Sequence, residues 1–250
     1  MLEIRNLTAG YPGHPVLQNI NLSLPQSQVT VIAGPNGCGK TTLLKALAGI
    51  LPCQGSIFLE GQRISGLSPK ERAQKIACLP QNRQVPEITV SRLVLHGRFP
   101  YLGYPRRYRR EDHLAAQAAM ARLGLEDLAD RPLTALSGGQ RQKAYLAMVL
   151  AQNTPVVLLD EPNTFLDIAH QRQMMDLARV LAAEGKTVVM VLHDLALALE
   201  TADHLVVMEG GCIRCRGDRE AVFSSGCLQQ VFGLEVKRLN TEDGWKYYYR

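Results

Sequence analysis

The chain has 250 residues, of which 46% are hydrophobic, and its formal net charge is +5. This size is sufficient for a core in one large domain or two small lobes, and the mild positive charge suits an anionic partner without selecting one. The longest uninterrupted apolar run, Ala144 to Ala151, is far shorter than the ~20 residues that cross a bilayer, which excludes a membrane-spanning helix. The first residues lack a basic segment followed by an apolar one, so we expect no signal peptide.

Alternating hydrophobic residues predict antiparallel strands within the first 65 residues. In "NINLSL", Ile20, Leu22 and Leu24 share one face, and "SIFLEG" places Ile57 and Leu59 in the same way. A period of two that is interrupted by Gly and Pro is typical of antiparallel strands.

A glycine-rich loop follows the first continuous apolar run. The run "VTVIAG", from Val29, predicts a strand buried on both faces, and the next residues match GxxxxGK[ST]. Glycines let the loop's N–H groups point at phosphate oxygens, and a helix that begins near Lys40 adds the positive end of its dipole. A glycine-rich turn without a ligand is the weaker interpretation, because the loop lies between a buried strand and a helix. The residues predicted to bind nucleotide are Gly34, Pro35, Asn36, Gly37, Cys38, Gly39, Lys40, Thr41 and Thr42.

Individual residues of this loop have predicted roles. We expect Lys40 to reach the β- and γ-phosphates, the Thr41 hydroxyl to bind Mg²⁺ and Thr42 to contact the α-phosphate side. We expect the Cys38 side chain to point away from phosphate and to make activity sensitive to thiol reagents.

Residues 81–136 are predicted to be mostly helical. Leu114, Ala118, Ala121 and Leu125 recur at helical spacing, which predicts a stripe facing the core. The run "YPRRYRRED" contributes arginines at 106, 107, 109 and 110. This run is either a solvated basic loop or a contact for lipid headgroups or an acidic segment.

Two further apolar runs end in residues that can do chemistry. "PVVLLDEP" ends in Asp160 and Glu161, and "KTVVMVLHD" ends in His193 and Asp194. Open α/β sheets bind ligands at the carboxyl ends of their strands, so these residues and the glycine loop are expected to form one site. We predict that Asp160 holds Mg²⁺ through water and that Glu161 orients and polarises the attacking water. The alternative is two acidic residues that merely cap a strand.

The cysteines and the C-terminal residues give no clear indication of a functional site. Six cysteines and no export signal predict a reduced state. Cys212 and Cys215 form a CxxC with Cys227 and His204 nearby, but a short strand entered through a Gly-Gly turn is favoured over a metal site. The last 20 residues alternate like a final hairpin.

The segment "LSGGQRQ", Leu136 to Gln142, identifies a family resemblance together with the glycine loop and "LLDEP". The chain resembles the nucleotide-binding subunit of an ATP-binding-cassette (ABC) transporter, over essentially its whole length and with the motifs in the family's order. The resemblance implies an α/β fold, the P-loop NTPase fold of ABC ATPases: a mixed core sheet flanked by helices, an N-terminal antiparallel β subdomain and an inserted helical subdomain. It implies a single domain over 1–250, with its core in 1–80 and 137–250 and the helical insert in 81–136.

The resemblance also implies roles for single residues. Gln81 resembles the glutamine that senses Mg²⁺ and the membrane partner, His193 the switch histidine at the γ-phosphate, and Tyr11 the aromatic that stacks on adenine. Asp167 ends "NTFLD", the segment that meets the other subunit, although serine-alanine-leucine-aspartate is commoner there. The signature residues that would contact the partner subunit's ATP are Ser137, Gly138, Gly139 and Gln140.

The expected partners follow from the same resemblance. Each ATP with its Mg²⁺ would be sandwiched between two copies of the chain in a head-to-tail homodimer. A single cassette without a membrane segment resembles importers, which implies integral permease subunits, a substrate-binding protein acting through the permease, and a peripheral location on the cytoplasmic face of the inner membrane. No nucleic-acid partner is expected, because the aromatic residues form no recognisable binding module.

The cargo is suggested by two segments, "HGRFPYLG" and "FLDIAHQ". Both resemble subunits that energise uptake of iron-siderophores, haem or cobalamin. Import of zinc, manganese or molybdate remains an alternative. A soluble ABC ATPase of DNA repair or translation is less favoured, because the chain has one cassette and no sustained heptads.

Overall fold

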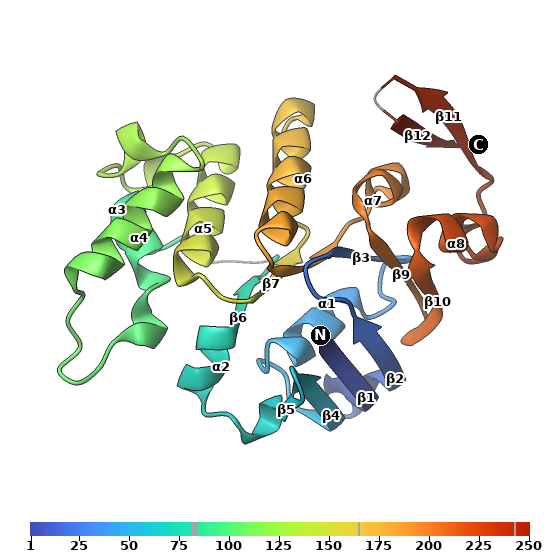
Figure 1. The fold of residues 1–250 in the computed structure, drawn as a ribbon, viewed down its shortest axis with the longest axis horizontal. Helices are drawn as coiled ribbons and strands as arrows, with labels where there is room; N and C mark the ends of the chain where they lie inside the picture. The colour runs from blue at the N-terminus through green and yellow to red at the C-terminus, as the bar shows by residue number, and fades with distance from the viewer. Residues whose placement is uncertain (82–84, 165, 243) are drawn as a thin grey trace.

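In the computed structural model, two sheets enclose a central helix, α1 (Lys40–Leu47) (Figure 1). The structure describes residues 1–81, 85–164, 166–242 and 244–250. Asn82 of "LPQN" and Phe165 of "NTFLD" therefore lie outside the described residues.

The N-terminal sheet is antiparallel, as the alternation predicted. Its strand order is β2-β1-β4-β5, and the bounds are β1 (Leu2–Tyr11), β2 (His14–Leu24), β4 (Cys53–Leu59) and β5 (Gln62–Arg63). Leu2 lies opposite Leu24 and Ile4 opposite Leu22, so the apolar residues share one face. That face packs on α1, which explains why alternation is clear in this part of the sequence.

The core sheet has six strands in the order β10-β9-β3-β8-β7-β6. Every residue of the three predicted strands is buried, and these strands are neighbours at the centre of the sheet. The pairs from β9 to β6 are parallel, whereas β10 runs antiparallel to β9, which makes the sheet mixed. The strands are β3 (Val29–Ala33), β6 (Ile76–Leu79), β7 (Val156–Asp160), β8 (Thr187–Val191), β9 (His204–Glu209) and β10 (Cys212–Asp218).

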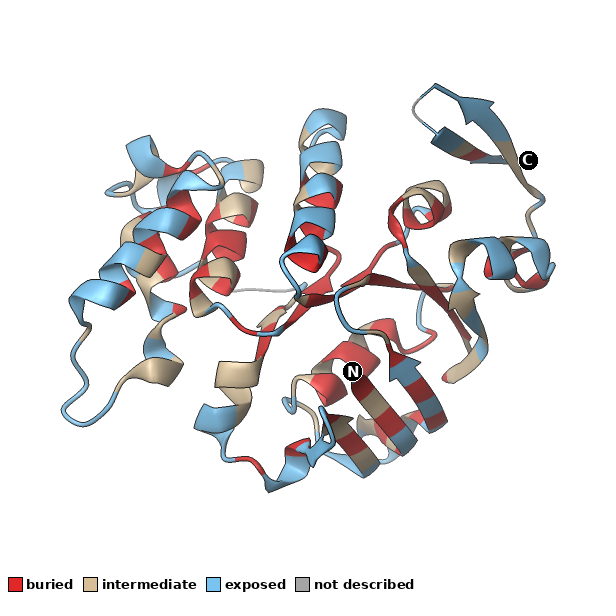
Figure 2. Cartoon of the chain, in the orientation of Figure 1, coloured by how far each residue is buried: buried red, intermediate tan, exposed pale blue. Residues whose placement is uncertain are grey.

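Apolar side chains leave the core sheet on both faces. Ile32 and Leu158 pack toward α1 and the antiparallel sheet, whereas Val31 and Val157 pack toward the helices on the other face. Figure 2 shows the central strands buried along their length. Besides α1, the helices described outside the 81–136 segment are η1 (Ile64–Gly66), α2 (Pro69–Lys75), α5 (Gly138–Gln152), α6 (Ile168–Ala183), α7 (Leu195–Thr201), α8 (Arg219–Ser224) and α9 (Cys227–Phe232).

The 81–136 segment is helical where described, as predicted. It contains α3 (Val90–His96), η2 (Phe99–Tyr101), α4 (Arg110–Ala121), η3 (Glu126–Leu128) and η4 (Leu133–Ala135). Backbone hydrogen bonds join its two ends, from Val90 N to Arg131 O (3.0 Å) and from Leu133 N to Ile88 O (3.0 Å). The helices pack against α5, which follows the segment in sequence.

The predicted apolar stripe of this segment was wrong at three of its four positions, and only Leu125, which is 1% exposed, faces the core as expected. Leu114 is 53% exposed, and Ala118 and Ala121 are also exposed. The buried residues of α4 are Asp112, Ala116, Ala119 and Met120. Arg98 Nε donates to Asp112 Oδ1 (3.0 Å), and this buried ion pair fixes which face of an alanine-rich helix turns inward.

The C-terminal region contains a disulfide between Cys215 of β10 and Cys227 of α9. The expected reduced state was therefore wrong for this pair. The strand entered through a Gly-Gly turn is confirmed, since Gly210 and Gly211 (φ +55° and +78°) precede β10. Among the described residues, no group of three or more His, Cys, Asp and Glu side chains is placed to hold a metal.

The final hairpin is also confirmed. It consists of β11 (Val236–Thr241) and β12 (Gly244–Tyr249). Tyr247 packs edge-on against Phe223 of α8, with 5.4 Å between ring centroids. Of the helices that the structure describes, none combines the length and apolar character needed to span a membrane.

Candidate active site

The glycine loop connects β3 to α1, as the motif requires. Gly39 has φ +102° immediately before the first helical residue, a conformation that favours glycine. A Cβ on Gly34 would lie 2.3 Å from the Met208 carbonyl oxygen, so no side chain fits there. These constraints place the loop's backbone at the N-terminus of α1, where N–H groups and the helix dipole favour an anion.

Lys40 lies across this loop. Its Nζ donates to the carbonyl oxygens of Gly34 (2.8 Å) and Pro35 (3.0 Å), and the residue is only 5% exposed. The ammonium is thereby held beside the loop, ready to pair with phosphate.

Cys38 lies in the core beneath the loop and is 4% exposed. Burial raises the pKa of its thiol, and the nearby Lys40 charge opposes that rise only in part. The reactive thiolate is therefore scarce at neutral pH. We now expect slow reaction with thiol reagents, in place of the sensitivity that the sequence position alone suggested.

Asp160 and Thr41 form the oxygen-rich side of the site. Thr41 Oγ1 donates to Asp160 Oδ1 (3.1 Å). Burial raises the pKa of the Asp160 carboxyl, while this hydrogen bond and the Lys45 and Lys40 charges act in the opposite direction. A hydroxyl, a carboxylate and the nearby Gln81 amide are the hard oxygen donors that fit Mg²⁺.

Glu161 is contacted from two sides. Gln81 Nε2 donates to Glu161 Oε2 (2.6 Å), and His193 Nε2 contacts Glu161 Oε1. The three side chains follow the carboxyl ends of β6, β7 and β8, which are adjacent strands. Glu161 has φ +50°, a left-handed conformation that non-glycine residues seldom adopt and that often occurs at functional sites.

Nine of the predicted site residues line one cleft of about 730 Å³. We call it the phosphate cleft, and its lining residues are Val16, Asn36, Gly37, Gly39, Lys40, Thr41, Thr42, Gln81, Glu161 and His193. Four further predicted residues lie outside the lining and contact residues that belong to it. Lys40 Nζ donates to the carbonyl oxygens of Gly34 and Pro35 and lies beside the sulfur of Cys38, and Thr41 Oγ1 donates to Asp160. Val16 was missed by the sequence analysis, because one valine in an alternating strand carries no signal for a ligand.

Tyr11 lies outside the phosphate cleft. It is 46% exposed in a neighbouring hollow formed with Pro52 and Gln54. Lys45 Nζ donates to its hydroxyl (3.3 Å), which places the ring beside α1. The structure therefore leaves adenine stacking by Tyr11 as a prediction.

The signature residues form a separate cleft of about 650 Å³. Ser137 caps α5: its Oγ accepts from Gln140 N (3.2 Å), while Ser137 N donates to Gln140 Oε1 (3.1 Å). Asp167 caps α6 in a similar way by accepting from His170 N (2.8 Å), and it lines the same cleft. This signature cleft contains Ser137, Gly138, Gly139, Gln140 and Asp167, and it shares no lining residue with the phosphate cleft.

A hydrogen bond connects the two clefts. Gln142 of α5 donates from Nε2 to the carbonyl oxygen of Pro162 (2.7 Å), the residue that follows Glu161. The helix that begins after Ser137 thus contacts the turn that follows Glu161 directly.

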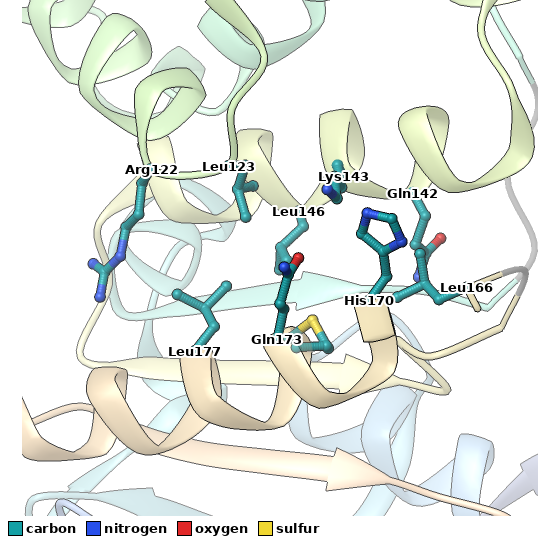
Figure 3. Close-up of a pocket in the computed structure, with 10 residues that line it drawn as sticks. Arg122, Leu123, Gln142, Lys143, Leu146, Leu166, His170, Gln173 and Leu177 are labelled. Carbon is teal, nitrogen blue, oxygen red and sulfur yellow. The ribbon is translucent and has the colours of Figure 1, made fainter. Parts of the chain in front are cut away.

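A smaller groove of about 320 Å³ extends the signature cleft between α5 and α6. Both hollows include Lys143, Leu166 and His170. Figure 3 shows Leu146 of α5 and Gln173 and Leu177 of α6 along this groove. The groove therefore continues the signature surface.

Comparison with known proteins agrees with these features. A family model described as "ABC transporter" matches residues 17–164. The chain is 43% identical over 236 residues to the achromobactin transport ATP-binding protein of Dickeya dadantii, covering 93% of this chain and 88% of that protein. It is 42% identical over 236 residues to the ferric enterobactin transport ATP-binding protein of Escherichia coli, covering 93% and 87%. Its fold matches the dimeric structure of a bacterial ABC transporter cassette with a TM-score of 0.77 and 26% identity, covering 88% of this chain and 99% of that one.

Proposed function

The chain belongs to the ABC transporter family, and on that premise we propose that it hydrolyses ATP to power import of a metal chelate through a separate membrane permease. The observation that carries the ATPase chemistry is the position of Glu161, which Gln81 and His193 hold beside Lys40 and Thr41. The cargo class, iron-siderophore, haem or cobalamin, is supported by similarity to importers of achromobactin and ferric enterobactin.

ATP would bind with its phosphates on the glycine loop. The loop N–H groups and the N-terminus of α1 would hold the β-phosphate, and Lys40 would reach the β- and γ-phosphates. Mg²⁺ would be held by Thr41 and, through water, by Asp160, with Gln81 nearby, and would neutralise charge on these phosphates.

Glu161 would orient and polarise the attacking water. Its two carboxylate oxygens are contacted by Gln81 and His193, which fixes the direction of the group. His193 would also contact the γ-phosphate, and its contact with Glu161 would then link nucleotide binding to the position of that carboxylate. A positioned carboxylate in a general-base role contributes about 10²- to 10⁴-fold to rate.

The signature cleft would complete the ATP site of a second copy. Because the two clefts of one chain share no lining residue, we infer that each chain supplies two half-sites. In a head-to-tail dimer, Ser137, Gly138, Gly139 and Gln140 would meet the partner's γ-phosphate, and Asp167 would lie at the interface. Hydrolysis would remove a shared anionic ligand and weaken the interface, which supplies the conformational step.

The proposed partners lie at a membrane. We place the chain peripherally on the cytoplasmic face of the inner membrane, bound to integral permease subunits that receive cargo from a substrate-binding protein. We also retain the division into a core (1–80 and 137–250) and a helical insert (81–136), because the ends of the insert are joined by hydrogen bonds.

Affinity purification of the tagged chain from native membranes in mild detergent tests this assignment. We expect a strongly apolar partner with many membrane-spanning helices, identified by mass spectrometry. If the chain were recovered with a soluble partner only, the proposed transport function would be contradicted, whereas the proposed ATPase chemistry would still stand.

Lys40→Ala is expected to weaken ATP binding by roughly 10- to 150-fold, because a charge-assisted hydrogen bond to phosphate contributes about 1.5–3 kcal/mol. Calorimetric titration of the monomer with ATP measures this loss, and Lys237→Ala on the C-terminal hairpin serves as the control for charge removal. Unchanged affinity would show that the phosphates bind elsewhere.

Tyr11→Ala is expected to weaken ATP affinity by roughly 5- to 150-fold if the ring stacks on adenine, since base–aromatic stacking contributes about 1–3 kcal/mol. Tyr11→Phe should bind normally, because it keeps the ring and removes only the hydrogen bond from Lys45 to the hydroxyl. Equal affinity for the wild type and Tyr11→Ala would assign the adenine to another surface, with Val16 as the next candidate.

A further inference from the structure

The loop between η2 and α4 concentrates positive charge and aromatic side chains on one projecting segment. From Arg98 to Arg110 the sequence contains five arginines and no acidic residue. In Figure 1 this segment projects at the lower left, ahead of α4, and Figure 2 shows most of it exposed. The ATPase chemistry uses none of these residues.

The base of this loop is fixed to the rest of the protein. Lys70 Nζ donates to the Leu102 carbonyl oxygen (2.7 Å), and Gln74 Nε2 donates to the Pro100 carbonyl oxygen (2.8 Å). On the other side, Arg109 N donates to Asp112 Oδ2 (2.9 Å). A loop with a fixed base can present its tip with little loss of conformational entropy on binding.

The tip is exposed. Tyr104 is fully exposed, at 101% of its reference area. A partner that covered this ring would remove its apolar surface from water. Phe99 is 47% exposed, and the Arg106 guanidinium lies 4.9 Å from its ring centroid. Aromatic and basic side chains therefore occupy the same surface.

The arginines of the tip make few ion pairs within the described part of the chain, so they can pair with an anionic partner. Arg109 has one long, exposed contact to Glu111 (3.7 Å), which contributes little in water. Within the described part of the chain, Arg107 and Arg110 make no ion pair. Asp112, the other acidic neighbour, is buried against Arg98.

We propose that this loop binds an anionic lipid surface, with its arginines on the headgroup phosphates and the Tyr104 ring at the headgroup level. Tyrosine is favoured at membrane–water interfaces, and clusters of basic residues bind anionic lipid. An acidic protein segment would also satisfy the arginines, but the lipid surface is favoured because the fully exposed ring stands at the tip of a projecting basic loop, where it can enter the headgroup layer while the arginines hold the phosphates. The inference deepens the proposed function by giving the chain its own contact with the membrane beside the permease.

Sedimentation of the purified full chain with lipid vesicles tests this proposal without the permease or ATP turnover. We expect binding to vesicles of phosphatidylcholine with phosphatidylglycerol, no binding to phosphatidylcholine alone, and weaker binding as salt is added. Arg107→Glu/Arg110→Glu is expected to lower partitioning at least about tenfold, because four units of charge change at the surface. The control Arg92→Glu/Arg250→Glu makes the same charge change elsewhere and should bind nearly normally.

A fluorescence measurement tests the role of Tyr104. In the background Trp245→Phe, which removes the chain's single tryptophan, Tyr104→Trp should show a blue-shifted emission with anionic vesicles only. Absence of vesicle binding, equal binding to neutral vesicles, or equal loss in both double variants would overturn the proposal. Binding without a blue shift would overturn the placement of the ring. Normal ATPase activity of Arg107→Glu/Arg110→Glu would show that a loss of lipid binding is separate from the catalytic function.

Discussion

Glu161→Gln is expected to lower steady-state ATP hydrolysis by about 10²- to 10⁴-fold while ATP binding stays intact. The amide keeps the size of the side chain and can still contact Gln81 and His193, but it cannot polarise water as a carboxylate does. Because binding without hydrolysis leaves ATP between the two copies, the variant should also accumulate as an ATP-dependent dimer.

Phosphate release and light scattering after size-exclusion chromatography measure the two effects on the same sample. Glu235→Gln, which makes the same chemical change near the C-terminal hairpin, should hydrolyse ATP at the wild-type rate. Normal turnover by Glu161→Gln would remove the catalytic role from this residue.

Ser137→Arg is expected to abolish hydrolysis while the monomer still binds ATP. Ser137 lies in the signature cleft and not in the phosphate cleft of its own chain. A long cation there would obstruct the partner's γ-phosphate and leave the Lys40 site of the same chain open. The substitution also removes the cap of α5, which costs about 0.5–2 kcal/mol, so a thermal melt must first show that the variant is folded.

Mixing Ser137→Arg with Lys40→Ala gives the sharper result, at an ATP concentration too low to load the weakened site of Lys40→Ala. In a head-to-tail dimer of Ser137→Arg with Lys40→Ala, one of the two ATP sites contains neither substitution. We therefore expect the mixture to regain ATPase activity that neither variant has alone. If Ser137→Arg cannot bind ATP as a monomer, or if the folded mixture remains inactive although mixed dimers form, the shared-site geometry is contradicted.

The sequence predicted the parts of the fold in which one physical requirement dominates. The strands β3, β7 and β8 are buried on both faces, so their sequences are almost continuously apolar. Each strand is followed within two residues by part of the phosphate cleft or its support: the glycine loop, Glu161 or His193. The glycine loop was equally clear, because Gly34 and Gly39 occupy positions where a side chain would clash or be strained.

The remaining features depend on contacts that the sequence does not display. Asp112 is buried in α4 because Arg98 pairs with it, which no hydrophobic pattern could reveal. The four residues of β6 form a short strand next to a helical region, so they gave little signal of their own. Cys215 and Cys227 meet only because α9 packs beside β10. Two candidate nucleotide contacts lie on either side of the turn between β1 and β2. Val16 lines the phosphate cleft, whereas Tyr11 lies in the neighbouring hollow.

ATP-driven uptake into proteoliposomes tests the account most directly. The chain would be purified with its permease from native membranes and reconstituted with ATP on the side of the nucleotide-binding subunits, and accumulation of an iron(III)-siderophore would be followed with labelled iron. We predict uptake that requires ATP and that Glu161→Gln abolishes without dissociating the complex. Uptake that is unaffected by Glu161→Gln, or a complex that accumulates zinc, manganese or molybdate but no iron-siderophore, haem or cobalamin, would contradict it.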